Sequence, residues 1–325
     1  MNLQTAFTKQ VGIEYPIICG AMYPCSNPEL VAAVSGAGGI GIVQPVSLTY
    51  VHKHDFREGL RWIRKAANNK PIGVNLLIET SSSKYLERNK QWLDIALEEG
   101  VRFFITALGD PRWVVDRAKA KGAVVYHDAT AAKWAQKAVS GGIDGLICVN
   151  NRAGGHAGHL SPKDLFAELK TFGVPLISAG GIGCSKDFAN ALNLGYQGVQ
   201  MGTRFIATQE CLAHDDYKNA ILKATAADIV LTEKITGVPV AIINTEFIKK
   251  RGLDPSPLAK WFLTSKRTKH YARMFYTLRS VWQLKHSLQK GSAYKDFFQA
   301  GKSVEGIDKI EPAAEIVKRF VKELS

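Results

Sequence analysis

The chain has 325 residues, of which 46% are hydrophobic and 22% are charged, and its formal net charge is +13. This composition supplies one large domain or two smaller ones with an apolar core, and it excludes a disordered or fibrous chain. No apolar run has the length of a transmembrane helix, and the first residues lack the apolar stretch of a secretion signal. The five cysteines are scattered without a CxxC pair, which argues against a disulfide scaffold or a zinc site and favours a cytoplasmic protein.

The positive charge is concentrated in one segment. Between Pro255 and Lys295 there are nine Lys or Arg residues and no Asp or Glu, and subtracting these nine charges from +13 leaves +4. A basic amphipathic helix there would suit an anionic membrane or a nucleic acid. Its apolar positions are equally ordinary for a helix packed on the protein or in a dimer interface, and this second interpretation is favoured, so we expect no nucleic-acid partner.

Short, continuous apolar runs recur through the first two-thirds of the chain at intervals that fit one strand plus one helix. Continuous apolar runs are typical of parallel strands that are covered on both faces. Asn27-Pro28 and Ser161-Pro162 are typical helix starts between such runs. The predicted strands are Pro16–Gly20, Gly39–Val43, Ile72–Leu77, Arg102–Ala107, Ala123–His127, Gly145–Val149, Pro175–Ala179 and Gly198–Met201.

Eight such strands alternating with helices predict a (β/α)8 barrel over residues 1–208, with an open, doubly wound sheet as the structural alternative. The rhythm stops after Thr208. Residues 209–300 are predicted to form a mainly helical lobe, and residues 301–325 to carry a C-terminal helix, Pro312–Leu324, that returns to the barrel.

Two glycine turns follow the last predicted strands, where barrels of this type hold phosphate groups. Gly180 and Gly181 follow the seventh strand, and paired glycines let backbone N–H groups approach a phosphate closely. After the eighth strand, Gly202 offers a further N–H group, Thr203 a hydroxyl and Arg204 a charge. Either turn alone is ordinary, but together they favour a phosphate-bearing cofactor. No GxxxxGK[ST] loop is present, so nucleotide triphosphate hydrolysis is unsupported.

A glycine-rich loop with two histidines, Asn150–His159, follows the sixth predicted strand. Metal binding would need further carboxylates or histidines in this loop, and the loop has none. His156, which is flanked by small residues, is favoured as a general base, whereas His159 is more typical of a solvated loop histidine.

Polar residues also end other predicted strands. Asn75 closes the third strand, where its amide would either cap the turn or bind a cofactor ring. His127 and Asp128 end the fifth strand and are both expected to face the barrel mouth. Met22, just after the first strand, would either support a flat ring or fill the core.

The segments YPIICGAM, GVNLL, AGGHAG, ISAGGIG, LGYQGVQMGTRFIATQE and TGVPV occur in this order along nearly the whole barrel. On these motifs the sequence resembles the nitronate monooxygenase family, formerly called 2-nitropropane dioxygenases. These are FMN-dependent (β/α)8 enzymes. Relatives on the same scaffold include flavin-dependent enoyl-ACP reductases and NADH:quinone reductases.

The resemblance implies roles for particular residues. His156 matches the catalytic histidine, which takes the α-proton of a nitroalkane or assists binding of a nitronate. Asn75 matches the amide that contacts the flavin ring. The other implied cofactor contacts are Met22, Gly154, the phosphate-binding pair Gly180 and Gly181, and the cradle Gln200, Met201, Gly202 and Thr203.

Three departures from the family pattern affect the substrate more than the flavin. Arg152 stands where Glu is common, Asp128 stands where Lys is common, and Gly20-Ala21-Met22 replaces Ala-Pro-Met. Asp128 is retained as a cofactor contact. Arg152 is expected to restore positive charge near the flavin and, with His159, to contact substrate.

The resemblance therefore implies oxidation of alkyl nitronates by O2 to carbonyl compounds and nitrite. An NAD(P)H-dependent reductase of quinones or enoyl thioesters is the alternative, and binding to an anionic membrane or nucleic acid through 255–295 is the weaker one. The expected partners are a small-molecule substrate and O2, while use of NAD(P)H and homodimer formation are left open.

Overall fold

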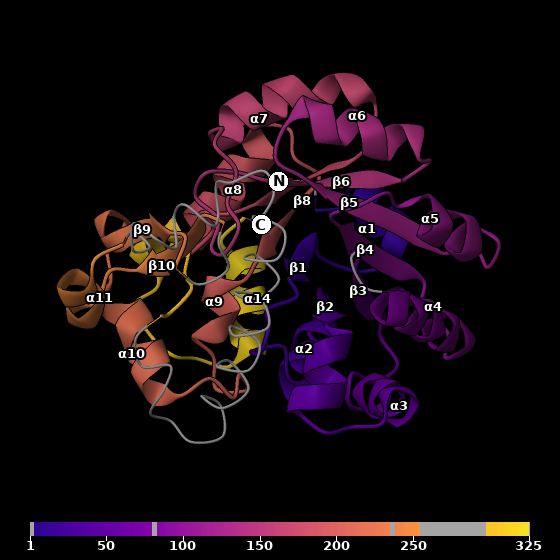
Figure 1. The fold of residues 1–325 in the computed structure, drawn as a ribbon, viewed down its shortest axis with the longest axis horizontal. Coiled ribbons are helices and arrows are strands. Elements are labelled where there is room, and N and C mark those ends of the chain that lie inside the picture. The colour runs from indigo at the N-terminus through magenta and orange to yellow at the C-terminus, as the bar shows by residue number, and fades with distance from the viewer. Residues whose placement is uncertain (1–2, 80–82, 235–237, 254–296, 325) are drawn as a thin grey trace.

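A computed structural model describes residues 3–79, 83–234, 238–253 and 297–324. Eight parallel strands close into a barrel in sequence order, with helices around its outside (Figure 1). The predicted (β/α)8 fold is therefore confirmed, and the largest difference from the predicted bounds is at β5, which continues to Ala129. The strands are β1 Ile17–Cys19, β2 Ile40–Val43, β3 Gly73–Leu77, β4 Phe103–Ala107, β5 Val124–Ala129, β6 Gly145–Val149, β7 Leu176–Ala179 and β8 Gly198–Met201.

The two helices whose starts were predicted, at Pro28 and Pro162, begin at those residues. The Ser161 hydroxyl accepts a hydrogen bond from the backbone N–H of Asp164, 3.1 Å away, and so caps α7. Asn27 precedes α2, but its side chain makes no cap: it donates to the carbonyl of Glu210 and accepts from the N–H of Leu212. The helices and turns of this layer are α2 Pro28–Gly36, η1 Ser47–Val51, α3 Phe56–Ala66, α4 Ser83–Glu98, α5 Arg112–Lys119, α6 Ala132–Ser140, α7 Pro162–Leu169, η2 Lys170–Phe172 and α8 Ser185–Asn193.

Alternation along each strand divides the core into two layers. Side chains at one set of positions fill the barrel interior, including Ile18, Phe103 and Ile177, and those between them pack under the helices, including Val74 and Leu76. This division determines which polar side chains can reach the barrel mouth.

A helix that the sequence analysis missed, α1 Ala6–Val11, closes the N-terminal end of the barrel. The Phe7 ring lies 5.7 Å from the Phe103 ring and 5.6 Å from the Tyr126 ring. The Tyr126 hydroxyl donates a 2.7 Å hydrogen bond to the Gln10 side chain. Aromatic packing and a paired hydroxyl thus seal this end.

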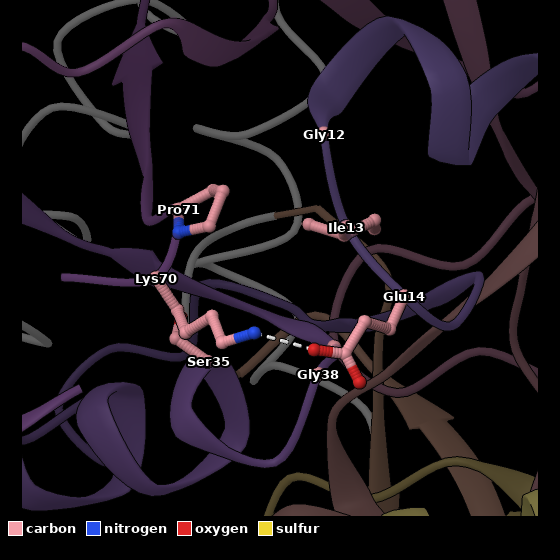
Figure 2. A pocket seen from close by; sticks show the side chains of 8 residues that line it. Gly12, Ile13, Glu14, Ser35, Gly38, Lys70 and Pro71 are labelled. Atoms are coloured by element: carbon pink, nitrogen blue, oxygen red, sulfur yellow. Dashed lines mark hydrogen bonds and ion pairs between the residues drawn. The ribbon is translucent and has the colours of Figure 1, made fainter. Parts of the chain in front are cut away.

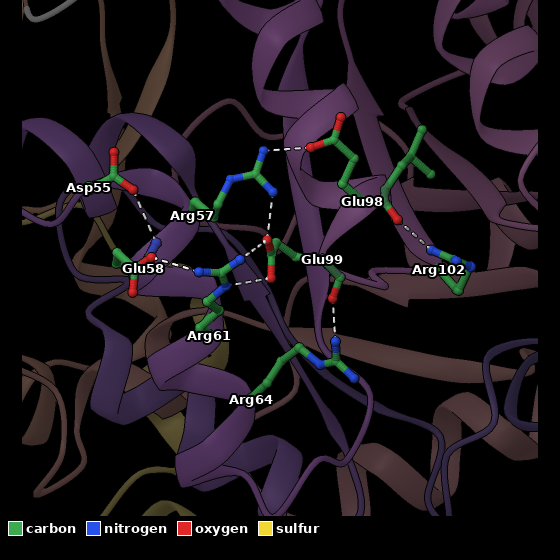
Figure 3. A network of polar contacts seen from close by, with 9 residues as sticks. Asp55, Arg57, Glu58, Arg61, Arg64, Glu98, Glu99 and Arg102 are labelled. Carbon is green, nitrogen blue, oxygen red and sulfur yellow. Dashed lines mark hydrogen bonds and ion pairs between the residues drawn. The ribbon is translucent and has the colours of Figure 1, made fainter.

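Polar groups near this end are paired with one another. Lys70 and Glu14 form an ion pair beside a small hollow under β1, β2 and β3 (Figure 2). On the helical layer, Arg57 and Arg61 both bind the carboxylate of Glu99, which follows α4, and the Arg64 guanidinium donates to the Glu99 carbonyl (Figure 3).

The chain after β8 differs in part from its prediction. Residues 209–253 contain helices, but they also contain a two-stranded antiparallel sheet of β9 Ile229–Thr232 and β10 Val240–Ile243, which the prediction of a mainly helical lobe did not include. The basic segment 255–295 lies outside the described residues, so its helix and its role stay predictions. The remaining elements are α9 Thr203–Ile206, α10 Asp215–Lys223, η3 Ala226–Asp228, α11 Glu246–Arg251, η4 Lys302–Gly306 and α14 Ala313–Lys322.

The C-terminal helix α14 packs against α2 and α8 at the side of the barrel (Figure 1). Its Ile316, Val317 and Phe320 side chains are fully buried. This position agrees with a helix that returns to the barrel, while the domain boundaries at 208 and 300 remain predictions. Among the described residues, no helix combines the length and apolar character needed to cross a membrane.

Candidate active site

Three inward-facing polar side chains line the barrel toward the C-terminal ends of its strands. Asn75 on β3 lies between Val74 and Leu76, both of which pack under the helices, so alternation directs Asn75 into the barrel. By the same alternation Asp128 on β5 follows the inward-facing Tyr126, and Gln200 on β8 follows Val199 of the outer layer. The structure therefore brings these three predicted site residues to one barrel interior.

Each of these side chains has a buried oxygen without a hydrogen-bond partner in the described part of the chain: Oδ1 of Asn75, Oδ1 of Asp128 and Oε1 of Gln200. A buried acceptor without a donor costs free energy, so such a group in a native protein calls for an explanation. A bound ring that carries N–H or O–H donors supplies one, because it would pair with oxygens that the protein leaves open. The residues present therefore fit a flavin ring.

Asp128 and its neighbour His127 face opposite sides of the β5 strand. Burial without a nearby cation raises the pKa of Asp128 to about 7. His127 points into the helical layer, where Nδ1 lies 2.8 Å from the Thr106 hydroxyl, and burial lowers its pKa to about 4. The expectation that both residues face the mouth is wrong for His127, because adjacent strand residues alternate in direction.

The glycine pair after β7 adopts backbone conformations that favour glycine. Gly180 has φ +116° and Gly181 has φ +82°. A Cβ on Gly180 would lie 2.5 Å from the backbone N of Ala153 and 2.6 Å from Oδ1 of Asn150. The turn therefore packs directly against the loop after β6, and any side chain on it would separate the two loops.

Asn150, which the sequence analysis did not select, connects these two loops. Its side chain is completely buried, donates to the Gly180 carbonyl at 3.0 Å and accepts from the Arg152 N–H at 2.8 Å. A buried amide satisfied on both sides holds the two loops in one arrangement. Its polarity directly after an apolar strand was the available signal.

The chain just before His156 is fixed by two backbone contacts. The Gly155 carbonyl accepts a 2.8 Å hydrogen bond from Ala241 of β10, and a Cβ on Gly154 would lie 2.8 Å from the backbone N of Gly301. His156 and His159 are both exposed on this loop. The protein around His156 nevertheless desolvates its ring enough to lower its pKa, which keeps the imidazole neutral near pH 7. A neutral imidazole can accept a proton.

The residues at the end of β8 and just after it offer different groups to a ligand. Met201 is buried in the helical layer, so its backbone rather than its side chain faces the site. A Cβ on Gly202 would lie 3.3 Å from the sulfur of Met22, which places the first and last strand ends together. The Thr203 hydroxyl accepts a 3.0 Å hydrogen bond from the N–H of Gly301, and its own hydrogen remains available for a ligand.

Arg204 does not join this cradle. Its guanidinium is completely buried, donates to the carbonyls of Ala207 and Lys309 at 2.8 Å each, and lies 3.9 Å from the Glu311 carboxylate. Burial lowers its pKa to about 10, so it remains a cation at neutral pH. The expectation that Arg204 supplies charge to a phosphate is wrong, because its side chain anchors the C-terminal segment instead.

Residues 298–302 complete the mouth from a distant part of the sequence. The Phe298 carbonyl accepts from Ile243 of β10, and the Lys302 N–H donates to the Arg152 carbonyl at 2.9 Å. Together with the Gly301–Thr203 hydrogen bond, this segment touches the loops after β6 and β8. No local motif predicted it. The described residues hold no cluster of His, Cys, Asp and Glu that could bind a metal ion.

Comparison with known proteins gives a consistent family. A family model described as nitronate monooxygenase matches residues 4–323. A Rhodococcus jostii protein named (3aS,4S,5R,7aS)-5-hydroxy-7a-methyl-1-oxo-octahydro-1H-indene-4-carboxyl-CoA dehydrogenase is 32% identical over 248 residues, which are 76% of this chain and 67% of that protein. A probable nitronate monooxygenase of Staphylococcus saprophyticus is 28% identical over 292 residues, covering 77% and 81% of the two chains. The structure of FabK from Thermotoga maritima superposes with a TM-score of 0.81 at 28% identity and covers 99% of this chain and 96% of that chain.

Proposed function

Because the chain belongs to the nitronate monooxygenase family, we propose that this flavin oxidoreductase binds FMN and oxidises alkyl nitronates with O2 to carbonyl compounds and nitrite. The observation that carries the proposal is the set of three buried oxygens inside the barrel mouth that have no hydrogen-bond partner among the described residues, together with glycine turns suited to a phosphate. A flavin nucleotide has both complementary parts, a ring with hydrogen-bond donors and a phosphate.

The protein's own residues would bind and orient this cofactor. Asn75 and Gln200 would accept hydrogen bonds from the ring, and the Gly180–Gly181 turn would receive the phosphate on backbone N–H groups. When bound, FMN supplies the redox chemistry, since it takes electrons from an organic substrate and passes them to O2. The barrel would thus hold the cofactor in a fixed position and in a partly desolvated environment.

His156 would act on the substrate's proton. Its lowered pKa keeps the ring neutral, so it can accept the α-proton of a nitroalkane near pH 7. A nitronate has already lost this proton and needs no base. We expect His156→Asn to reduce kcat/KM for nitroethane by about 100-fold or more, with a much smaller effect on ethyl nitronate. An equal reduction of kcat/KM for nitroethane and ethyl nitronate would contradict the role of His156 as a base.

A second candidate function is oxidoreduction of an acyl thioester. It is favoured by the name of the Rhodococcus jostii relative, a carboxyl-CoA dehydrogenase, and by Asp128, an acid that faces the mouth where the family commonly has Lys. In this case the flavin would exchange electrons with a nicotinamide or a thioester rather than with a nitronate.

One experiment separates the two candidates. The purified protein is denatured to identify any released flavin, and the native protein is then titrated anaerobically with propionate 3-nitronate, NADH or NADPH. Flavin reduction by the nitronate alone supports the nitronate monooxygenase. Rapid bleaching by NADH or NADPH supports the reductase, and a protein that neither carries nor takes up FMN contradicts both.

A further inference from the structure

The Arg152 side chain lies across the glycine turn after β7. A Cβ on Gly181 would be 2.5 Å from Nε of Arg152 and 2.9 Å from its Cβ and Cδ. The whole stem of the arginine therefore covers the face of Gly181. This places its guanidinium beside the turn suited to a phosphate.

The backbone of Arg152 is fixed to the same turn. Its N–H donates to Asn150, whose amide also donates to the Gly180 carbonyl, and its carbonyl accepts from Lys302. Arg152 and the glycine turn are thus held by one buried amide. A guanidinium positioned in this way loses little further freedom when it binds an anion.

The neighbouring backbone donors are open. Among the described residues, the N–H groups of Gly181, Ile182 and Gly202 donate to no protein acceptor. The next N–H groups along the chain, those of Gly183 and Cys184, are already bound by the Asp187 carboxylate at 2.9 Å and 3.2 Å. The open donors of this turn therefore lie at Gly181, which Arg152 covers, and at the next residue.

The present partner of Arg152 is weak. Its guanidinium lies 3.9 Å from the Glu305 carboxylate, and the two side chains are 36% and 64% exposed. A long, exposed ion pair contributes little and is easily exchanged. A phosphate carries more charge and offers a guanidinium two parallel hydrogen bonds.

We propose that Arg152 is a phosphate anchor, which binds the cofactor's phosphate together with the open N–H groups of the Gly180–Gly181 turn and releases Glu305 to solvent when it does so. This inference rests on the proposed binding of FMN. It assigns the departure from the common Glu at this position to cofactor affinity, not to substrate choice.

The test compares two flavins that differ only in the phosphate. Apoprotein is titrated with FMN and with riboflavin, and the quenching of flavin fluorescence gives each Kd. We expect Arg152→Gln to weaken FMN binding by about 10- to 100-fold, as for loss of charged hydrogen bonds, and to leave riboflavin binding within about twofold of the wild type. Arg152→Lys keeps the positive charge but loses the paired donors of the guanidinium, so its FMN affinity should lie between those of the wild type and Arg152→Gln.

Glu305→Gln and Arg117→Gln are the matched controls. Removing the competing carboxylate should leave FMN binding unchanged or tighter, and Arg117, which pairs with Asp94 on the outer helices, should not affect it. Equal weakening of FMN and riboflavin by Arg152→Gln, or no weakening of either, overturns the phosphate role. A wild-type protein that binds neither flavin contradicts the proposed function itself. If Arg152→Gln does not fold, as judged by circular dichroism, Arg152→Lys and Glu305→Gln still decide the question.

Discussion

The two ends of the barrel treat their polar groups in opposite ways. At the N-terminal end, Tyr126 donates to Gln10, Lys70 pairs with Glu14, and the Arg64 guanidinium binds the carbonyl of Glu99. At the C-terminal mouth, oxygens of buried amide and carboxyl groups lack hydrogen-bond partners within the described ranges of the chain, and the glycine turn keeps the N–H groups of Gly181 and Ile182 open there. Paired groups stabilise the fold, while unpaired ones leave binding capacity at a cost in stability. In barrels of this type, chemistry is concentrated at the C-terminal end.

The largest expected effect comes from filling the glycine turn. Gly180→Ala would force a Cβ within 2.5 Å of the Ala153 backbone at φ +116°. We expect the free energy of unfolding to fall by about 2–4 kcal/mol and FMN affinity to fall by more than about 100-fold. Gly122→Ala is the control at the other end of the barrel, since φ is +68° but no atom lies within 4 Å of the added Cβ. It should cost about 1 kcal/mol and leave FMN binding unchanged.

Opposite pH dependences are expected from adjacent residues of β5. The pKa of Asp128 is raised to about 7, so the folded apoprotein binds a proton that the unfolded chain has lost, and this residue's contribution to stability declines as pH rises from about 4 to 7. The pKa of His127 is lowered to about 4, so its contribution is lost as pH falls below about 6.5. As pH rises from 4 to 8, the free energy of unfolding of Asp128→Asn should therefore increase by about 1–3 kcal/mol relative to that of the wild type.

The free energy of unfolding of His127→Gln should increase by a similar amount, relative to that of the wild type, as pH falls from 7 to 4. The measurement is urea unfolding of the apoproteins across this pH range. In the wild type the two residues change the free energy of unfolding in opposite directions as pH varies. Each single variant should therefore show the pH dependence that the remaining residue causes. Parallel profiles for both variants would contradict the assignment of both residues as buried, uncharged groups.

Replacing one unpaired group should separate stability from binding. Gln200→Met removes a buried oxygen that has no hydrogen-bond partner in the described structure, so we expect the apoprotein to be more stable by about 0.5–2 kcal/mol while FMN affinity falls roughly 10-fold. Tyr126→Phe removes a paired hydroxyl at the other end, and should lower stability by about 0.5–1.5 kcal/mol with no change in FMN binding. If both variants were less stable than the wild type, the proposed difference between the two ends of the barrel would be contradicted.

The smallest effect is expected on the helical layer. Hydrogen bonds from Arg61 and Arg57 lower the pKa of Glu99, so the ion pairs contribute above the usual carboxyl range and are lost in acid. Glu99→Gln should lower Tm by at most a few degrees at pH 7, and the difference should shrink at high salt. FMN binding should not change. A large loss of cofactor in this variant would mean that the helical layer supports the mouth.

The sequence predicted the elements that depend on local pattern and missed those that depend on distant partners. The eight strands follow from continuous apolar runs, and the predicted positions of Asn75 and Gln200 follow from where those runs end. The direction of His127 was available from alternation along β5. Arg204 was not predictable in this way, because its direction is set by the carbonyl of Lys309 and by Glu311, about a hundred positions further along.

The β9–β10 sheet and the segment at residues 298–302 were missed for the same reason. Each is short and carries no strong periodicity, and the segment gains its place through contacts with Thr203 and Arg152. Asn75, His156 and the glycine turns were chosen from their places at the ends of predicted strands, whereas Gly154 was added through the family resemblance, and their roles remain proposals. Asn150 was missed because its hydrogen bond to Gly180 joins two loops that are 30 positions apart.

The hydrogen bond between Gly301 and Thr203 spans 98 positions of the chain. A ribosome releases Thr203 and the glycine turns well before residues 298–302 emerge, so the eight strands are available to fold while the mouth still lacks part of its wall. Closing so long a connection costs entropy that is recovered only once the barrel is formed. Assembly of the proposed cofactor site is therefore expected to be a late step of biosynthesis, after residues 298–302 have emerged.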